Sequence, residues 1–200
     1  MSALLWTGAL GSWLFVVTFL VDGATRPGYS PIRHPVSALA LGPRGGIQTA
    51  NFVVCGLAIT AGAVALVPDT VLLGLAVGLF GLGLVASGVF PMDPMRGYPP
   101  GAPGGTPEHT SRRHDLHDHA GAVVFLTLPV AAAVAALTLG DTGWRWYSGV
   151  TAVLLMVGFR VFGSAWENDD PRTGLVQRVV IGVGWSWLGL VFAHSATASV

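Results

Sequence analysis

Residues 114–119 carry three imidazoles and two carboxylates directly before the apolar stretch 120–139. In a helix, His114, His117 and Asp118 share one face, because residues three and four apart are neighbours on the helix surface. Two such imidazoles can bind one metal ion, as ligand pairs three residues apart do in di-iron helix bundles. Ionisable groups at membrane depth cost roughly 2.5–3.5 kcal/mol each, so we interpret the cluster as a candidate functional site.

Asp93 is the candidate third metal ligand. One proline lies two residues before it and another directly after it, and prolines stiffen the backbone and end the preceding helix. We predict that Asp93, His114 and His117 hold one divalent transition metal, with zinc as the first choice. An open position on the metal could activate water. Asp118 or His34 would then be the catalytic base or a supporting group.

Several further polar residues are expected at the same end of the molecule. The candidates for binding an anionic lipid headgroup are Arg33, Arg112 and Arg113. A structural polar network is predicted from Arg160, Glu167, Asp169, Asp170 and Arg178. Long arginine side chains also reach lipid headgroups by snorkelling, so that alternative stays open for the arginines within the helices.

The histidine cluster also has simpler explanations. If the helix begins near Ser111 as its N-cap, Asp115 and Asp118 lie in or near the first turn. Carboxylates there stabilise a helix by roughly 0.3–1 kcal/mol each through its dipole. Arginines beside the cluster can anchor to anionic lipid at about 1 kcal/mol apiece. A proton relay or pH sensor is a third alternative, because histidine titrates near neutral pH.

The elements that must position these residues are membrane helices. The chain is 52% apolar and 10% charged, with a mean hydropathy of +0.64. A helix of about 20 apolar residues crosses a bilayer, and no alternating barrel pattern is present. We predict one all-α integral membrane domain over residues 1–200, a single bundle of six transmembrane helices. These helices are expected at about 3–21, 47–67, 71–90, 120–139, 146–165 and 175–193.

Six helices would place almost all charged residues at one end of the bundle. Of the 26 Asp, Glu, Arg and His residues, only Asp69, Asp141, Arg145 and His194 belong to the other end. A Gly- and Pro-rich segment, 97–107, is expected to be a mobile loop within the polar end. The chain has no lysine, and the bias in arginine predicts a cell-membrane protein with cytoplasmic polar loops and both termini outside.

Short ordered motifs resemble a known family. They are residues 34–42 (HPVSALALG), Asn51-Phe52, residues 88–93 (GVFPMD) and the histidine-bearing start of the fourth helix. Together they resemble the bacterial and archaeal membrane family called domain of unknown function 998, over nearly the whole chain. The resemblance implies six membrane helices with polar signatures at Ser37, Gly42, Asn51, Asp93 and 114–121, and it implies no activity.

Two classes of function remain open. The first is a membrane scaffold that binds a lipid headgroup or a partner subunit at the polar end. The second is a metal-dependent hydrolase or transferase that acts on a lipid-borne group there. Whether the protein is an enzyme is left open. We expect membrane lipids as partners, allow an oligomer or partner subunit, and expect no nucleic acid.

Overall fold

The computed structural model describes residues 1–68 and 70–198. Within them, six helices are long and apolar enough to cross a membrane, which confirms the predicted fold class. The helices are α1 (Ser2–Thr25), α2 (Gly45–Leu66), α3 (Val71–Val89), α4 (Arg112–Thr138), α5 (Thr142–Glu167) and α6 (Thr173–Ala198). A short 3-10 helix, η1 (Val36–Ala40), lies between α1 and α2.

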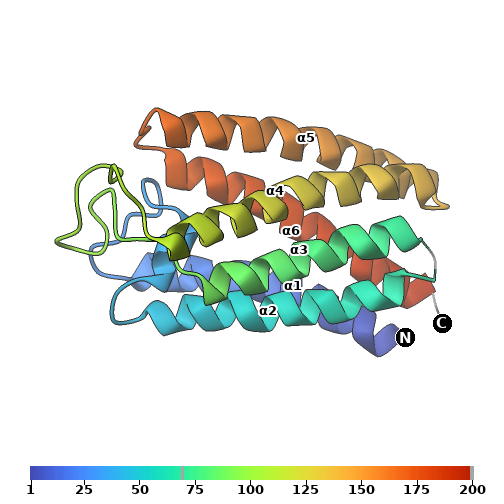
Figure 1. Ribbon diagram of the computed structural model, residues 1–200. Helices are drawn as coiled ribbons and strands as arrows, with labels where there is room; N and C mark the ends of the chain where they lie inside the picture. The colour runs from blue at the N-terminus through green and yellow to red at the C-terminus, as the bar shows by residue number, and fades with distance from the viewer. Residues whose placement is uncertain (69, 199–200) are drawn as a thin grey trace.

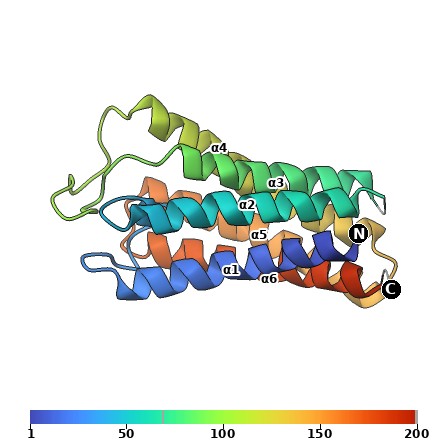
Figure 2. The ribbon, with the colours of Figure 1, turned by 90° about the horizontal axis from the view of Figure 1, so that it is seen from below.

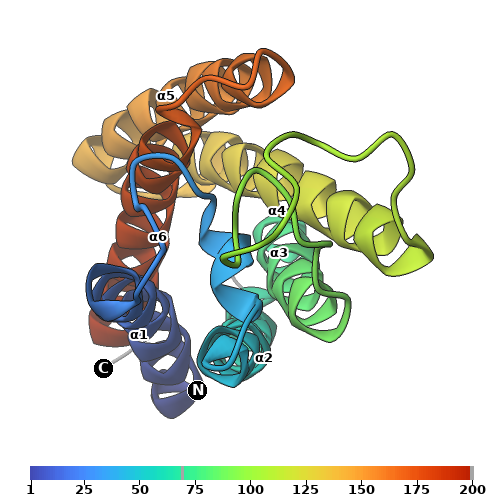
Figure 3. The same ribbon diagram turned by 90° about the vertical axis from the view of Figure 1, so that its left-hand side faces the viewer.

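The six helices form one bundle with two unlike ends. Each helix packs against the next in the chain, and α6 returns to pack against α1. The start of α1 and the end of α6 lie at one end of the bundle, and the long connections lie at the other (Figure 1, Figure 2). We call the second the loop end. Here η1 contacts α1, α2 and α6, and Figure 3, which looks onto the loop end, shows it inside the ring of helices.

Aromatic side chains fill the centre of the bundle. The Trp185 indole stacks on Phe15 with ring centroids 5.3 Å apart and meets the edge of Phe80 at 4.7 Å. At α2 and α3 the backbones approach closely, because a Cβ atom on Gly56 would lie 2.7 Å from the carbonyl oxygen of Gly81. Small residues at such positions let membrane helices pack by van der Waals contact.

Helix α4 begins at Arg112, well before the apolar stretch predicted from residue 120. The Ser111 Oγ accepts a hydrogen bond from the backbone N–H of His114 at 3.2 Å, as the alternative start near Ser111 required. Since this N-cap satisfies one backbone donor of the first turn, the helix can start within a polar segment. The histidines therefore lie on the helix itself rather than in a loop before it.

The segment between α3 and α4 folds back on itself at the loop end. The backbone N–H of Arg96 donates to the Gly105 carbonyl at 3.1 Å, and that of Gly97 donates to Pro103 at 2.8 Å. Met95 and Tyr98 are buried. The segment is thus tied to the bundle at its start, and the mobility predicted for 97–107 stays a prediction.

Candidate functional site

A cavity of about 230 Å³ lies between α4 and α5 at the loop end. The two helices are close at the far end of the bundle and diverge toward the loops (Figure 1, Figure 3). The buried residues of α5 are Ser148, Thr151, Ala152 and Leu155, so none of them follows Leu155. The part of α5 after Leu155 therefore stands away from the bundle core and forms one wall of the cavity, which we call the α4–α5 pocket.

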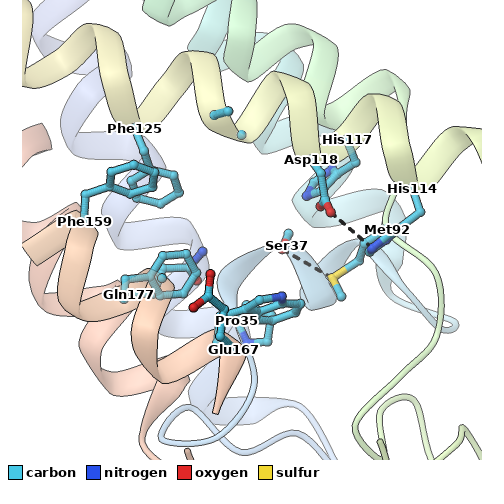
Figure 4. Close-up of a pocket in the computed structure, with 15 residues that line it drawn as sticks. Pro35, Ser37, Met92, His114, His117, Asp118, Phe125, Phe159, Glu167 and Gln177 are labelled. Atoms are coloured by element: carbon cyan, nitrogen blue, oxygen red, sulfur yellow. Dashed lines mark hydrogen bonds and ion pairs between the residues drawn. The ribbon is translucent and has the colours of Figure 1, made fainter. Parts of the chain in front are cut away.

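The pocket changes from polar to apolar along the helix axes. Its polar lining residues are Ser37, His114, His117, Asp118, Glu167 and Gln177, and its aromatic ones are Phe125, Phe159, Phe162 and Trp166. Polar groups lie near the loop end of each helix. The phenylalanines lie one to two turns deeper, and Phe125 stacks on Phe159 at a centroid distance of 5.4 Å (Figure 4). Asp118 and Glu167 come from opposite walls.

His114 has a hydrogen bond at one ring nitrogen and a carboxylate beside the other. Its Nδ1 accepts a hydrogen bond from the backbone N–H of Asp93 at 3.1 Å. The proton of the neutral ring therefore sits on Nε2, which lies 3.4 Å from Oδ2 of Asp118. Two engaged nitrogens fix the orientation of the buried ring and leave no free lone pair on it.

His117 has the opposite tautomer. Its Nδ1 lies 2.8 Å from the Phe90 carbonyl and 3.2 Å from the Ser87 carbonyl. Because both partners are acceptors, Nδ1 carries the proton and Nε2 of the neutral ring keeps its lone pair. Nε2 has no protein partner among the described residues, and His117 lines the pocket. His117 is therefore the available imidazole acceptor of the cluster.

Asp93 is directed at the N-terminus of α4 rather than at the imidazoles. Its two carboxylate oxygens accept from the Ser111 backbone N–H at 2.6 Å and from Ser111 Oγ at 2.7 Å. Partial burial opposes ionisation, but the two bonds from Ser111 and the nearby His114 outweigh it and lower the pKa of Asp93. The carboxylate is thus an acceptor for the cap residue.

These geometries bear on the predicted metal site. Among residues 1–68 and 70–198, no group of three or more His, Cys, Asp or Glu side chains is placed to hold a metal ion. In the arrangement described, His117 offers one lone pair, while His114 and Asp93 use theirs on backbone and hydroxyl donors. The arrangement does not match three simultaneous ligands, and a metal at Asp93, His114 and His117 stays a prediction.

A second cavity of about 50 Å³ continues inward from the pocket. The two share Ser37, His117, Gly121, Phe125 and Gln177 as lining residues. The Gln177 Oε1 accepts from the Val36 backbone N–H at 2.7 Å, and its amide nitrogen has no partner in the described part of the chain. Trp185 lines the inner cavity, and its buried indole N–H has no partner within residues 1–68 and 70–198. Two donors and one imidazole acceptor are thus available here.

The arginines predicted to bind a headgroup lie elsewhere. Arg33, Arg112 and Arg113 are exposed, and none of them lines either cavity. Among the described residues they form no ion pair. They remain candidates for contact with lipid at the loop end, but the pocket itself has no cationic side chain in its described lining.

His34 is buried outside the pocket. Its Nδ1 accepts from the Ser30 backbone N–H at 2.9 Å, and its ring packs between Tyr29 and Tyr98 at centroid distances of 5.4 and 5.3 Å. Burial lowers the pKa of His34, the nearby arginine charges lower it further, and the backbone of Arg96 partly opposes them. The structure therefore separates His34 from Asp118, the other candidate base.

The residues predicted to form a polar network take different positions. The Arg178 guanidinium donates to the carbonyls of Pro31 and His34 at 2.6 and 2.9 Å, which ties α6 to the segment before η1. Asp169 pairs with Arg96 at 3.3 Å. Asp170 accepts from the Arg172 backbone, Glu167 lines the pocket, and Arg160 is exposed.

A second network, not predicted from the sequence, is centred on Asp22. Its carboxylate pairs with Arg26 and, at 2.6 Å, with Arg44. Arg26 is 6% exposed and also donates to the carbonyls of Leu39 and Leu41 at 2.8 and 2.9 Å. The four-residue spacing of Asp22 and Arg26 is typical of an ion pair on a helix. This spacing is the sequence signal from which the network could have been predicted.

Fold and site together define a multi-pass membrane protein: a six-helix bundle with an amphipathic pocket at one end. The chain belongs to the family described as protein of unknown function (DUF998), whose family model matches residues 9–194. This confirms the resemblance found in the sequence motifs. No curated protein and no solved structure matches the chain.

Proposed function

We propose that this protein is a membrane scaffold that binds the headgroup region of an amphiphilic lipid in the α4–α5 pocket. The supporting observation is the gradient of polarity along the pocket. Asp118 and Phe125 lie seven residues apart on α4, which corresponds to roughly 10 Å of helix. Over that depth the lining changes from carboxylate, imidazole and amide groups to aromatic rings, as the chemistry of a lipid changes from headgroup to chain.

Two glycines make the pocket easy to close without harming the fold. Gly121 and Gly163 line it, and a Cβ atom on either would meet no other atom within 4 Å. A leucine at either position extends into the pocket. Because glycine is the less favourable helix former, the substitution also favours the helix by about 1 kcal/mol or less.

The test is lipid retention by the full chain purified in a mild detergent, measured by native mass spectrometry. We expect the wild-type protein to retain a lipid, and Gly121→Leu and Gly163→Leu to lose it. Gly182→Leu is the matched control, since Gly182 lies on α6, does not line the pocket and also has open space at its Cβ position. Equal retention in wild type and Gly121→Leu would refute the proposal.

A partner subunit is the alternative occupant of the pocket. It would appear in the same experiment as a protein that copurifies in a fixed ratio and is lost from Gly121→Leu but kept by Gly182→Leu. That outcome would replace the lipid with a subunit while leaving the scaffold role in place.

The metal-dependent alternative has its own measurement. It predicts that purified protein carries about one zinc or similar ion per chain, and that His117→Ala, which removes the available lone pair, loses it. The hydrolase or transferase hypothesis would then regain support. Metal content unchanged by His117→Ala would count against it.

We also propose that the loop end faces the cytoplasm of a cell-membrane protein and that both termini lie outside. The loops and helix ends there contain Arg26, Arg33, Arg44, Arg96, Arg112, Arg113 and Arg172, against Arg145 at the other end. An excess of arginine in cytoplasmic loops sets the orientation of membrane proteins.

A further inference from the structure

The charged groups of the α4–α5 pocket are all acidic. Asp118 and Glu167 line it from facing helices (Figure 4). Asp118 is 60% exposed as a side chain, and Glu167 is exposed and forms no ion pair within the described residues. No arginine stands among the described lining residues of either cavity. An anionic headgroup would therefore meet two carboxylates and no compensating cation.

Arg96 packs against the lining residue Trp166 but does not itself line the pocket. The Arg96 guanidinium lies over the Trp166 ring at 3.8 Å from its centroid and pairs with Asp169 at 3.3 Å. It also donates to the Trp166 carbonyl at 2.5 Å. With its donors engaged by Asp169, Thr106 and the Trp166 carbonyl, Arg96 is not free to receive a phosphate.

Aromatic rings adjoin the carboxylates. Phe162 and Trp166 lie within one or two turns of Glu167 on α5, with ring centroids 6.4 Å apart, and Phe162 lies 5.4 Å from Phe125. Aromatic faces carry negative potential and attract ammonium groups, most strongly where water is excluded. The carboxylates and the aromatic ring faces thus both favour a positively charged group in the bound ligand.

The buried amide and imidazole supply the remaining polar contacts. Gln177 is 6% exposed, lines both cavities and has an amide nitrogen without a partner in the described chain. His117 presents Nε2 as an acceptor nearby. A neutral donor and a neutral acceptor suit a hydroxyl or carbonyl of a headgroup. They do not supply the positive charge that phosphate binding requires.

We propose that the pocket selects amphiphiles whose headgroup carries a positive amine or quaternary ammonium group over those with a phosphate. The inference rests on the proposed function and names the chemical class of its ligand. The ammonium group lies between Asp118 and Glu167, and the chain follows the phenylalanines into the hydrocarbon region. A headgroup hydroxyl, where present, bonds to Gln177 and His117.

The test uses three probes with the same tail: hexadecyltrimethylammonium, hexadecanol and hexadecyl phosphate. Each is titrated into the full chain in maltoside detergent, and the apparent Kd is measured by native mass spectrometry. We expect the ammonium probe to bind about tenfold more tightly than the alcohol, equivalent to ~1.4 kcal/mol, and the phosphate to bind most weakly. Asp118→Asn with Glu167→Gln should reduce the ammonium affinity to that of the alcohol.

The control removes two carboxylates from the loop end without touching the pocket. Glu108→Gln with Asp115→Asn does this, because both residues are exposed and neither lines a cavity. That variant should keep the ammonium preference. A phosphate probe that binds wild type as tightly as the ammonium probe overturns the inference, as does an ammonium preference unchanged by Asp118→Asn with Glu167→Gln.

The same data separate this inference from the proposed function. If the probes bind the wild type and not Gly121→Leu, and the phosphate probe binds most tightly, the lipid pocket is supported and only the charge selectivity is refuted. If none of the three probes binds, or if Gly121→Leu binds them as wild type does, both proposals fail.

Discussion

Asp93 and His114 bond to each other across 21 residues, through the Asp93 backbone N–H and the His114 Nδ1 at 3.1 Å. The Asp93 carboxylate in turn accepts from Ser111, the N-cap of α4, at 2.6 and 2.7 Å. Three contacts thus join the end of α3 to the first turn of α4. This clasp fixes where α4 begins and therefore how the histidines enter the pocket.

Loss of the clasp should lower stability. Asp93→Asn replaces one accepting oxygen with a donor, and Ser111→Ala removes the cap, so each should cost about 1–2 kcal/mol of unfolding free energy. The measurement is chemical or thermal unfolding of the full chain in detergent. Because the two residues contact each other, the double variant should cost less than the two single effects together. Simple additivity would show that the bonds do not act as a unit.

The network centred on Asp22 should be the more sensitive of the two. Asp22→Ala leaves the buried Arg26 guanidinium without its carboxylate, which costs about 3–5 kcal/mol for a buried charge. Arg44→Ala is the matched control, since that side chain is 41% exposed and its removal leaves Asp22 paired with Arg26, so we expect a loss of about 1 kcal/mol or less. Equal losses for the two variants in an unfolding assay would contradict the assigned burial.

Stability should depend on the protonation of His34. Because its pKa is lowered in the folded state, the unfolded chain binds more protons near the ordinary histidine pKa of about 6.5. The contribution of neutral His34 to the stability of the fold is therefore fully present above that pH. It is lost as the pH falls toward the pKa that His34 has in the folded protein. His34→Asn, which keeps an acceptor near the Nδ1 position, should flatten the melting temperature between neutral and mildly acidic pH. An unchanged slope would assign the effect to other groups.

Membrane orientation can be read by labelling. The single native cysteine, Cys55, is buried. An introduced cysteine is therefore the one that we expect the maleimide to label. Gly104 at the loop end and Gly140 at the other end have open space around them. We expect Gly140→Cys to react with a membrane-impermeant maleimide in intact cells and Gly104→Cys to react only after permeabilisation. The reverse pattern would invert the proposed orientation.

The six helices could be predicted because hydropathy over about 20 residues is a local property of the chain. The start of α4 was harder to place, since its first two turns contain Arg, His and Asp and are helical through the Ser111 cap rather than through apolar character. Helix ends depend on single hydrogen bonds, which average hydropathy does not report.

The sequence predicted which candidate residues lie together better than it predicted their contacts. His114, His117 and Asp118 do line one pocket with Glu167, as their helical spacing allowed. Which nitrogen of each imidazole carries the proton depends on carbonyls and N–H groups from α3 and the segment after it, and no local pattern gives those contacts. The burial of His34 between two tyrosines likewise depends on the path of the loops.

The divergence of α4 and α5 occurs at one end of the bundle only, so under the proposed function the pocket would lie at the headgroup level of a single leaflet. An amphiphile in that leaflet would then enter sideways with its headgroup at the right depth, whereas one in the opposite leaflet would first have to flip. Occupancy of the pocket would therefore follow the composition of one half of the bilayer. The part of α5 after Leu155, which has no buried residue, would form one edge of that entrance.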